Sequence, residues 1–383
     1  MAGCTTDMVS PDSALQDKVP GQELYSDVPI EFGYGGMTKA DIGNTALSGH
    51  FGLFSKLKGT DDLSKTDRLN FRNRVIRYEN DFGFRFGYAS EDRTMYYPAS
   101  DEEYSFYAYY TYQHDSLIRA GVSTDDMTIS TRTKTYIHMK SFGTPCVLGS
   151  DGDVLWSKAE SYDAATDTYI DGFNADIVKG GFKPVFTFGH PVAVVSFTVS
   201  LAENTTKPLG TTRLRLEHLW LMNSPYQADL CIVDVEEDPD KNMEGRFENL
   251  QYTDEESKVP FLRGATGNRN LETWLAAGDE GVRKVPGREG YMVIVPQDGP
   301  LVCRLRLGRY SMKANGTYGS ADGFWKYDVI LDPDDYLSKD DPGYGKGYQA
   351  GMVYNYNIVV DYRSINPSSG VSGPYVKGEL VTQ

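Results

Sequence analysis

The feature that most constrains this chain is a series of short segments, spread over its whole length, in which apolar residues alternate with others. In residues 28–34, Val28, Ile30, Phe32 and Tyr34 occupy every second position. A period of two places these side chains on one face of an extended strand. No segment longer than about two turns has the 3.6-residue period of an amphipathic helix. The pattern therefore predicts an all-β chain built of β-sandwiches.

Alternation and turn residues predict many further strands along the chain. They are expected in residues 50–57, 74–78, 82–88, 128–138, 214–222, 228–235, 324–331, 352–362 and 375–381. We expect two hairpins, one in residues 95–112 with its turn at 98–103 and one in residues 291–307 with its turn at 296–300. In the first hairpin, one face of the second arm should carry Tyr104, Phe106, Ala108 and Tyr110, and the other face Tyr107 and Tyr109.

The length of 383 residues favours two domains. Residues 1–27 are polar and without period, as in a tether. Residues 151–159 are expected to form a surface helix or loop. The segment 184–201 is the richest in β-branched residues, so we place the domain junction just before it. This predicts an N-terminal sandwich in residues 28–183 and a C-terminal sandwich with its tail in residues 184–383.

The charge and the cysteine pattern exclude several classes of partner. A net charge of −16 argues against nucleic acid or an anionic membrane surface as an electrostatic partner. No apolar run approaches the ~20 residues that span a bilayer. The four cysteines lack the spacing of zinc or redox motifs. Three of them are predicted to be buried free thiols: Cys146, Cys231 and Cys303.

The signatures of common enzymes are absent, so we predict neither an enzyme nor a cofactor. The sequence contains no HExxH, GxSxG or GxxxxGK[ST] motif. The five histidines are scattered, and the aspartates of residues 332–341 lack calcium-loop spacing, so no metal is predicted. Trp156 and Trp274 lie in polar surroundings and are candidate platforms for sugars, whereas Trp220 lies in an apolar strand and is expected in the core.

The first residues carry a possible export signal. Ala2-Gly3-Cys4 resembles the end of a bacterial lipoprotein signal, in which small residues precede a cysteine that takes the lipid. The alternative is an N-terminal cysteine without such a role.

Several segments together resemble the fimbrillin-like family, the subunits of type V pili of Gram-negative anaerobes. The segment VPIEFGYGGMTKA resembles the first strand of that family and its processing site, and residues 50–57 resemble the next strand. MYYPASDEEYSFYAYYTY is similar to its tyrosine-proline hairpin. Further matches lie in the second half of the chain: FTFGHPVAVVSFTV, YMVIVPQDGPLVCRLRL and AGMVYNYNIVVDY.

The resemblance implies two transthyretin-like β-sandwich domains and a non-catalytic pilus subunit that serves adhesion. It would be exported as a lipoprotein, with lipid on Cys4 holding it at the outer membrane, and reach the fimbrium on the cell surface. A trypsin-like protease would cut between Lys39 and Ala40. The first strand would then be lost, and a strand of a neighbouring pilus subunit, such as its residues 375–381, would replace it.

Two alternatives stay open at this point. Without the resemblance, Lys39 is an ordinary exposed lysine in a hairpin loop. The chain as a whole could also be a surface lipoprotein that binds glycans through β-sandwich domains; a secreted hydrolase is a more distant alternative.

Overall fold

A computed structural model shows that the chain is an all-β protein, which confirms the predicted fold class. The structure describes residues 24–37, 49–60, 69, 71–79, 83–87, 93–111, 127–129, 134–140, 154–202, 211–235, 244–255, 273–275, 283–284, 291–361 and 375–380. Within these ranges the only helices are α2 (Ala175–Lys179) and the 3-10 turn η4 (Pro333–Asp335). No helix in the described part is long and apolar enough to cross a membrane.

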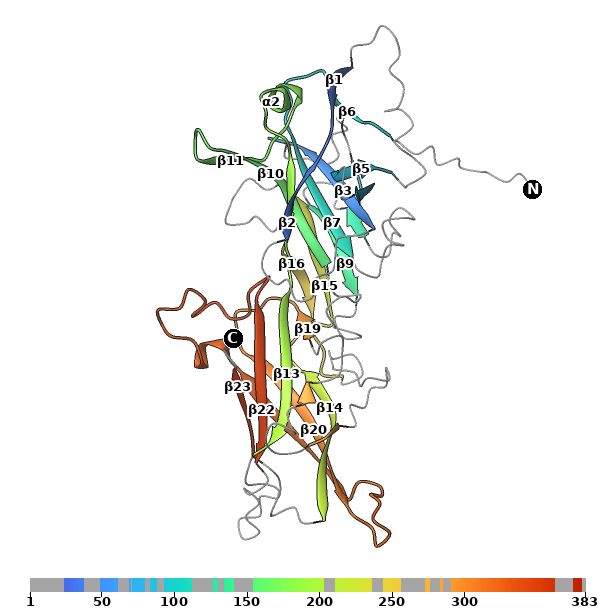
Figure 1. The fold of residues 1–383 in the computed structure, drawn as a ribbon, viewed down its shortest axis with the longest axis vertical. Helices are drawn as coiled ribbons and strands as arrows, with labels where there is room; N and C mark the ends of the chain where they lie inside the picture. The colour runs from blue at the N-terminus through green and yellow to red at the C-terminus, as the bar shows by residue number, and fades with distance from the viewer. Residues whose placement is uncertain are drawn as a thin grey trace, which may run out of the picture.

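Eight strands form a sheet at the upper end of the molecule, which we call the N-terminal sheet (Figure 1). Their order is β2 (Gly33–Met37), β12 (Val185–Phe188), β10 (Val154–Asp163), β7 (Tyr104–Thr111), β3 (His50–Leu57), β4 (Arg74–Glu79) and β5 (Gly83–Phe86), with β11 (Thr168–Ile170) beside β10. All pairs are antiparallel except β2 with β12, which is parallel. A bridge between Phe32 and Phe84 brings β5 back towards β2, so the sheet curls on itself.

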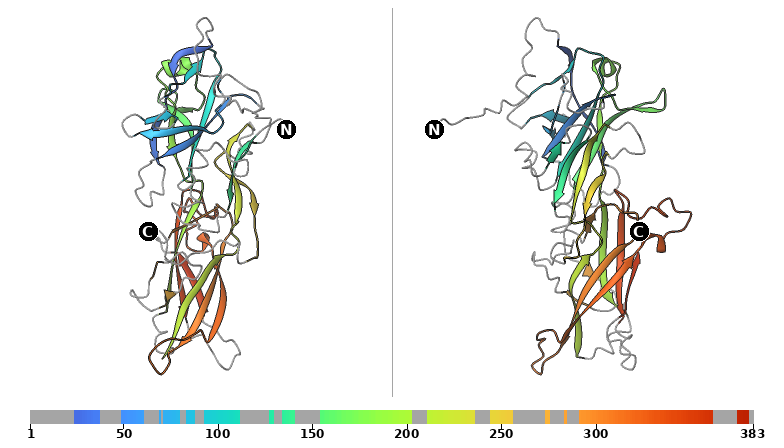
Figure 2. Two further views of the ribbon diagram at one scale, coloured as in Figure 1. Left: turned by 90° about the vertical axis from the view of Figure 1, so that its right-hand side faces the viewer. Right: turned by 180° about the vertical axis from the view of Figure 1, so that it is seen from behind.

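A smaller ribbon and a four-stranded sheet adjoin the N-terminal sheet. The ribbon pairs β1 (Tyr25–Pro29) with β6 (Tyr96–Pro98). The middle sheet has the order β16 (Phe247–Gln251), β15 (Gln227–Asp234), β9 (Lys134–Lys140) and β8 (Met127–Ile129). Its strands lie between the upper and lower ends of the elongated molecule (Figures 1 and 2). The middle sheet therefore joins strands from distant parts of the chain.

Two sheets pack face to face at the lower end. The first has the order β18 (Arg283–Lys284), β13 (Ala193–Leu201), β22 (Val353–Asp361) and β23 (Tyr375–Leu380), with β19 (Tyr291–Ile294) also beside β13. The second has the order β17 (Thr273–Trp274), β14 (Thr212–Leu221), β20 (Leu301–Ser311) and β21 (Gly323–Leu331). Their inner faces share a core of aliphatic side chains, among them Val195, Leu219 and Leu305.

The central strand β7 buries both of its faces. Tyr104, Phe106 and Ala108 belong to the core of the N-terminal sheet. Tyr107 and Tyr109 belong to the core shared with the middle and lower sheets. The predicted division of these side chains between the two faces is therefore confirmed.

Several predicted elements are wrong in their pairing. The segments 95–112 and 291–307 contain the expected strands but are not hairpins, because β6 pairs with β1 and β19 pairs with β13. Their partner arms join other strands: β7 lies between β3 and β10, and β20 between β14 and β21. Residues 154–159, the described part of the segment 151–159, belong to strand β10 rather than to a helix or loop.

The segment 184–201, which is predicted to follow the domain junction, forms two strands in different sheets. β12 pairs with β2 and β10 in the N-terminal sheet. β13 begins at Ala193 in the lower part. In addition, β9 from the first half pairs with β15 from the second half. The two-domain division stays a prediction, but the sheet changes after Phe188 rather than at residue 184.

Two of the three cysteines predicted as buried free thiols are confirmed. Cys231 and Cys303 are free and fully buried. Cys146 lies outside the described residues. Burial is the largest cause that raises the pKa of both described thiols well above the ordinary value.

We expect Cys231 and Cys303 to resist N-ethylmaleimide in the native chain, because the reagent needs an accessible thiolate. In a C4S/C146S background, mass spectrometry should find neither residue modified in native buffer and both modified in denaturant. Rapid modification of either residue in the native chain would contradict the burial.

Candidate functional site

The candidate site is the place where the N-terminal segment, which we define as residues 24–37, packs against the rest of the molecule. We call this place the seat of the segment. Its alternating side chains point into the core: Val28, Ile30 and Phe32 are 7%, 4% and 2% exposed. Glu31, between them, is exposed. The sequence predicts one continuous strand over residues 28–34, and this prediction is wrong. The segment changes partner in its middle, because Ile30 N–H donates to Met95 O (2.7 Å) while Gly33 N–H donates to Pro184 O (2.9 Å).

Phe32 is the deepest side chain of the segment. Its ring centroid lies 4.9 Å from that of Phe186, 5.1 Å from that of Phe106 and 6.1 Å from that of Phe86. The contact with Phe106 is edge-on, one of the favourable arrangements of aromatic pairs. Phe32 therefore fills a socket lined by rings from three other strands.

The last part of the segment, β2, pairs only with β12 among the described strands, and the two strands pack closely. A Cβ atom on Gly35 would lie 2.3 Å from Thr187 Oγ1 and 3.1 Å from Val185 Cγ1. A side chain at position 35 would therefore have to displace Thr187 and Val185, so glycine allows the close approach of β2 to β12. Tyr34 is half-buried, and its ring stacks at a tilt on Tyr78 with the centroids 4.9 Å apart.

Charged contacts add little to the hold on this segment. Lys183 Nζ lies 2.9 Å from Glu31 Oε2, and Lys179 Nζ lies 3.0 Å from Asp27 Oδ1. All four side chains are largely exposed, and such pairs contribute about 0–1 kcal/mol. Burying Val28, Ile30 and Phe32 at roughly 1.5–3 kcal/mol each contributes roughly 5–9 kcal/mol before ordering costs. Apolar burial therefore dominates.

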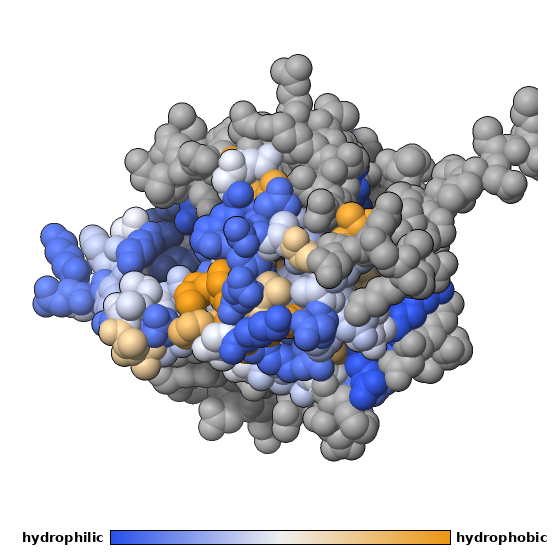
Figure 3. Space-filling view, turned by 90° about the horizontal axis from the view of Figure 1, so that it is seen from above, coloured by the Kyte–Doolittle hydropathy of each residue, from blue (hydrophilic) through white to orange (hydrophobic). Residues whose placement is uncertain are grey.

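The upper end of the molecule is mostly hydrophilic where it is described, with only small hydrophobic patches (Figure 3).

The structure describes some of the site residues that the sequence predicts. Val28, Ile30, Phe32 and Tyr34 lie in or beside the core. Cys4, Lys39 and Ala40 lie outside the described residues. Lys39 follows the last residue of β2 by two positions.

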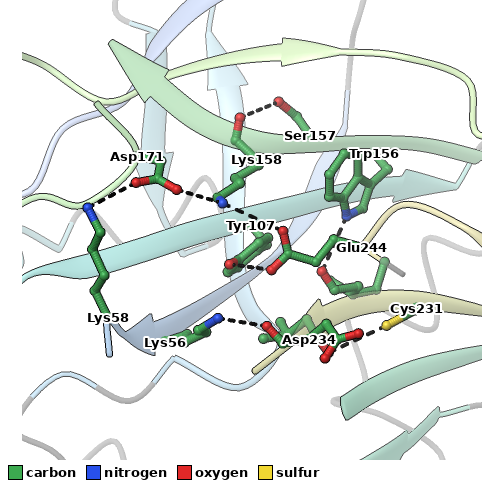
Figure 4. Close-up of polar contacts among 12 residues, drawn as sticks. Lys56, Lys58, Tyr107, Trp156, Ser157, Lys158, Asp171, Cys231, Asp234 and Glu244 are labelled. Carbon is green, nitrogen blue, oxygen red and sulfur yellow. Dashed lines mark hydrogen bonds and ion pairs between the residues drawn. The ribbon is translucent and has the colours of Figure 1, made fainter. Parts of the chain in front are cut away.

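A second cluster, which we call the polar joint, lies between the N-terminal sheet and the segment next to β15 (Figure 4). Tyr107 Oη donates to Glu244 Oε1 (2.7 Å), and Lys158 Nζ lies 3.6 Å from Glu244 Oε2. Lys158 also contacts Asp171 Oδ2 at 2.8 Å, and Lys58 contacts Asp171 Oδ1 at 3.1 Å. Sequence reasoning missed the joint because its members are far apart in the chain.

The joint continues to a partly buried lysine. Lys56 Nζ donates to the backbone oxygen of Asp234 (2.7 Å). Burial is the main reason that the pKa of Lys56 is lowered. Burial also acts to lower the pKa of Lys158, but Glu244 and Asp171 raise it overall. In this arrangement each lysine is paired with an oxygen acceptor at the contact between the sheets. The residues of the joint do not form a pair of nucleophile and adjacent base, as covalent catalysis would need.

The aspartates and tryptophans that the sequence analysis considered for metal or sugar binding include several with a structural role. Asp332 caps η4 by accepting from Asp334 N–H, and Asp334 Oδ1 accepts from Gly345 N–H (2.9 Å). The described residues hold no group of three or more His, Cys, Asp or Glu side chains that could bind a metal ion. Trp220 is buried, as predicted. Trp274 packs against Tyr310 and Tyr318.

Comparison with known proteins gives a likeness in fold. No protein-family model matches the chain, and no curated protein matches it. Its structure is similar to that of a fimbrial protein from Bacteroides vulgatus, with a TM-score of 0.52, 10% identity, and coverage of 93% of this chain and 98% of the other. At that identity the likeness concerns the fold alone.

Two other structures show a lower similarity. A candidate cell adhesion protein from Bacteroides uniformis has a TM-score of 0.41 at 13% identity, covering 92% of this chain and 96% of its own. The fimbrial anchor protein Mfa2 from Porphyromonas gingivalis has a TM-score of 0.35 at 10% identity, covering 92% and 98%.

We expect Phe32→Ala to lower the free energy of unfolding by about 3–5 kcal/mol, because it leaves a cavity among three rings. Urea denaturation measures the change. Glu31→Ala, which removes the neighbouring exposed side chain and its ion pair, should cost no more than about 1 kcal/mol. Equal effects of the two variants would contradict the socket.

The polar joint predicts a pH dependence. Burial acts to raise the pKa of Asp171, but Lys158 and Lys58 lower it overall. A carboxylate with a lowered folded pKa stabilises the chain above its unfolded pKa and loses that contribution as the pH falls through the folded pKa. Asp171→Asn should therefore cost about 1 kcal/mol or less at pH 7, and the difference from the wild type should shrink at pH 3.

Urea titrations at the two pH values test this expectation. Asp298→Asn, at an exposed site on another loop, is the matched control and should be neutral at both. A cost of Asp171→Asn that is as large at pH 3 as at pH 7 would rule out the ionic contribution.

Proposed function

We propose that this chain is a non-catalytic structural subunit of a cell-surface pilus that polymerises by strand exchange and serves adhesion. The observation that carries the proposal is the seat of the N-terminal segment: three alternating apolar side chains in an aromatic socket, on a segment whose last strand, β2, pairs only with β12 among the described strands. The fold shared with a fimbrial protein supports it.

In this proposal a trypsin-like protease cuts between Lys39 and Ala40. After the cut, the N-terminal segment is held by non-covalent contacts alone. Its departure would expose the backbone edge of β12 and the rings of Phe86, Phe106 and Phe186. Unpaired strand edges accept further strands, and pockets at alternate positions select apolar side chains.

The strand of a neighbouring subunit would take the vacated seat. β23 is our candidate donor, because it lies at the edge of its sheet and pairs only with β22 among the described strands. The precursor would be exported as a lipoprotein with lipid on Cys4, which would hold it at the outer membrane until assembly into the fimbrium.

Limited trypsin treatment tests the processing step. Lys39 is the only lysine or arginine between β2 and β3 in the sequence. We expect cleavage of the wild type after Lys39, followed by ladders of multimers on unheated gels. Lys39→Gln should abolish both, whereas Lys346→Gln, at an exposed lysine of another loop, should change neither.

Two outcomes would contradict the proposal. One is a wild type that is cut at Lys39 but stays monomeric in light scattering. The other is a Lys39→Gln variant that still forms ladders after trypsin treatment.

A further inference from the structure

A concave site on the outer face of the N-terminal sheet is not explained by strand exchange. Trp156, Lys158, Glu160 and Tyr162 follow one another at every second position of β10 and line this site. The alternate residues Leu155 and Ala159 are buried in the opposite core. The two-residue period of the strand thus gathers one aromatic, two charged and one further aromatic side chain on a single outer row.

The walls of the site come from two neighbouring strands. Val185 and Thr187 of β12 line one side. Tyr169 of β11 lies directly opposite Tyr162 in the β10–β11 hairpin, which projects from the body of the molecule (Figures 1 and 2). The site has a volume of about 440 Å³. That lies within the range of about 300–1,000 Å³ that is usual for small-molecule sites.

The two tyrosines are unusually exposed for such large side chains. Tyr162 is 52% exposed and Tyr169 is 68% exposed. Their ring centroids are 5.3 Å apart at an interplanar angle of 51°. The hydroxyl of Tyr162 donates to Asp167 Oδ1 (2.7 Å), which fixes that ring. The pair forms an open, pre-oriented aromatic wall, and ordering it on binding costs little entropy.

Trp156 forms the inner end of the site. A Cβ atom on Gly245, whose φ is +69°, would lie 2.7 Å from the indole, so glycine lets the backbone cover part of that ring. The indole N–H donates towards Ile232 O (3.4 Å). The ring is thereby held in place between the sheet and the segment beyond β15.

The charges of the site disfavour an anionic ligand. Lys158, its only cation, already contacts Asp171 at 2.8 Å and Glu244 at 3.6 Å. Glu160 adds a further carboxylate. The lining therefore carries one positive and one negative side chain, and its lysine is already engaged by carboxylates, so nothing in the lining compensates the charge of a sialylated or sulfated sugar. Glu160, Ser161 and Thr187 still offer hydrogen-bonding groups to hydroxyls.

We propose that this site binds a neutral saccharide, with a pyranose ring packed on Tyr162 and Tyr169 and its hydroxyls hydrogen-bonded along β10. A pyranose has an apolar C–H face and a polar rim, which matches an aromatic wall beside polar side chains. The proposal deepens the adhesive role proposed above by naming the class of ligand. It does not require cleavage at Lys39 or assembly.

The test uses the full, uncleaved chain on an array of immobilised oligosaccharides that end in galactose, N-acetylglucosamine, mannose or fucose, with sialylated counterparts. We expect binding to at least one neutral class. Tyr162→Ala/Tyr169→Ala should weaken it about tenfold or more, because both aromatic contacts are lost. Tyr162→Phe/Tyr169→Phe keeps the rings and should stay within about threefold of the wild type.

Tyr252→Ala is the matched control, because this tyrosine is 54% exposed and does not line the site. It should bind like the wild type. The proposal is overturned if the chain binds no neutral glycan or only sialylated ones, if the double alanine variant binds like the wild type, or if the phenylalanine variant loses as much as the alanine variant.

A separate measurement distinguishes this proposal from the proposed function. The double alanine variant should still form multimers after trypsin treatment, and Lys39→Gln should still bind the array. A chain that binds glycans but never polymerises would contradict the pilus role and would still support the saccharide site.

Discussion

The packing of Phe32 is the contact on which the arrangement of the N-terminal sheet depends. Its ring meets Phe86, Phe106 and Phe186, which come from β5, β7 and β12. Its backbone bridges to Phe84 and brings the two ends of the curled sheet together. Because these contacts span the seam, one side chain near the N-terminus stabilises strands from distant parts of the sequence. Truncation of this side chain would leave a cavity at that seam, because closely packed rings relax only partially around a missing one.

Lys158 belongs both to the polar joint and to the lining of the proposed saccharide site. Towards the middle sheet, Lys158 joins the polar joint through Glu244 and Asp171. Towards solvent, it lines the proposed saccharide site with Trp156 and Glu160. A side chain fixed by two carboxylates is pre-organised, which is useful at a binding site because little freedom remains to be lost. The joint that holds the sheets together therefore also orders one wall of the site.

The errors of the sequence-based predictions have two causes. Alternation identified the strands in residues 95–112 and 291–307, but neighbours in sequence were taken as partners, and β6 and β19 pair elsewhere. β10 was missed because its buried row includes the small residues Ser157 and Ala159, which weaken the apolar signal. Strand pairing depends on which edges meet in space, and no local pattern encodes that.

The sequence by itself determined the all-β class, the faces of β7, the burial of Cys231 and Cys303, and the inward row Val28, Ile30 and Phe32. Each of these follows from the local order of side chains along an extended backbone. Only the tertiary structure decided that the N-terminal segment changes partner at Ile30–Phe32 and that β12 and β13 part into different sheets. It also decided that Tyr169 stands opposite Tyr162. These features arise from contacts between segments that the chain brings together only on folding, where packing and hydrogen-bond satisfaction select one pairing among many.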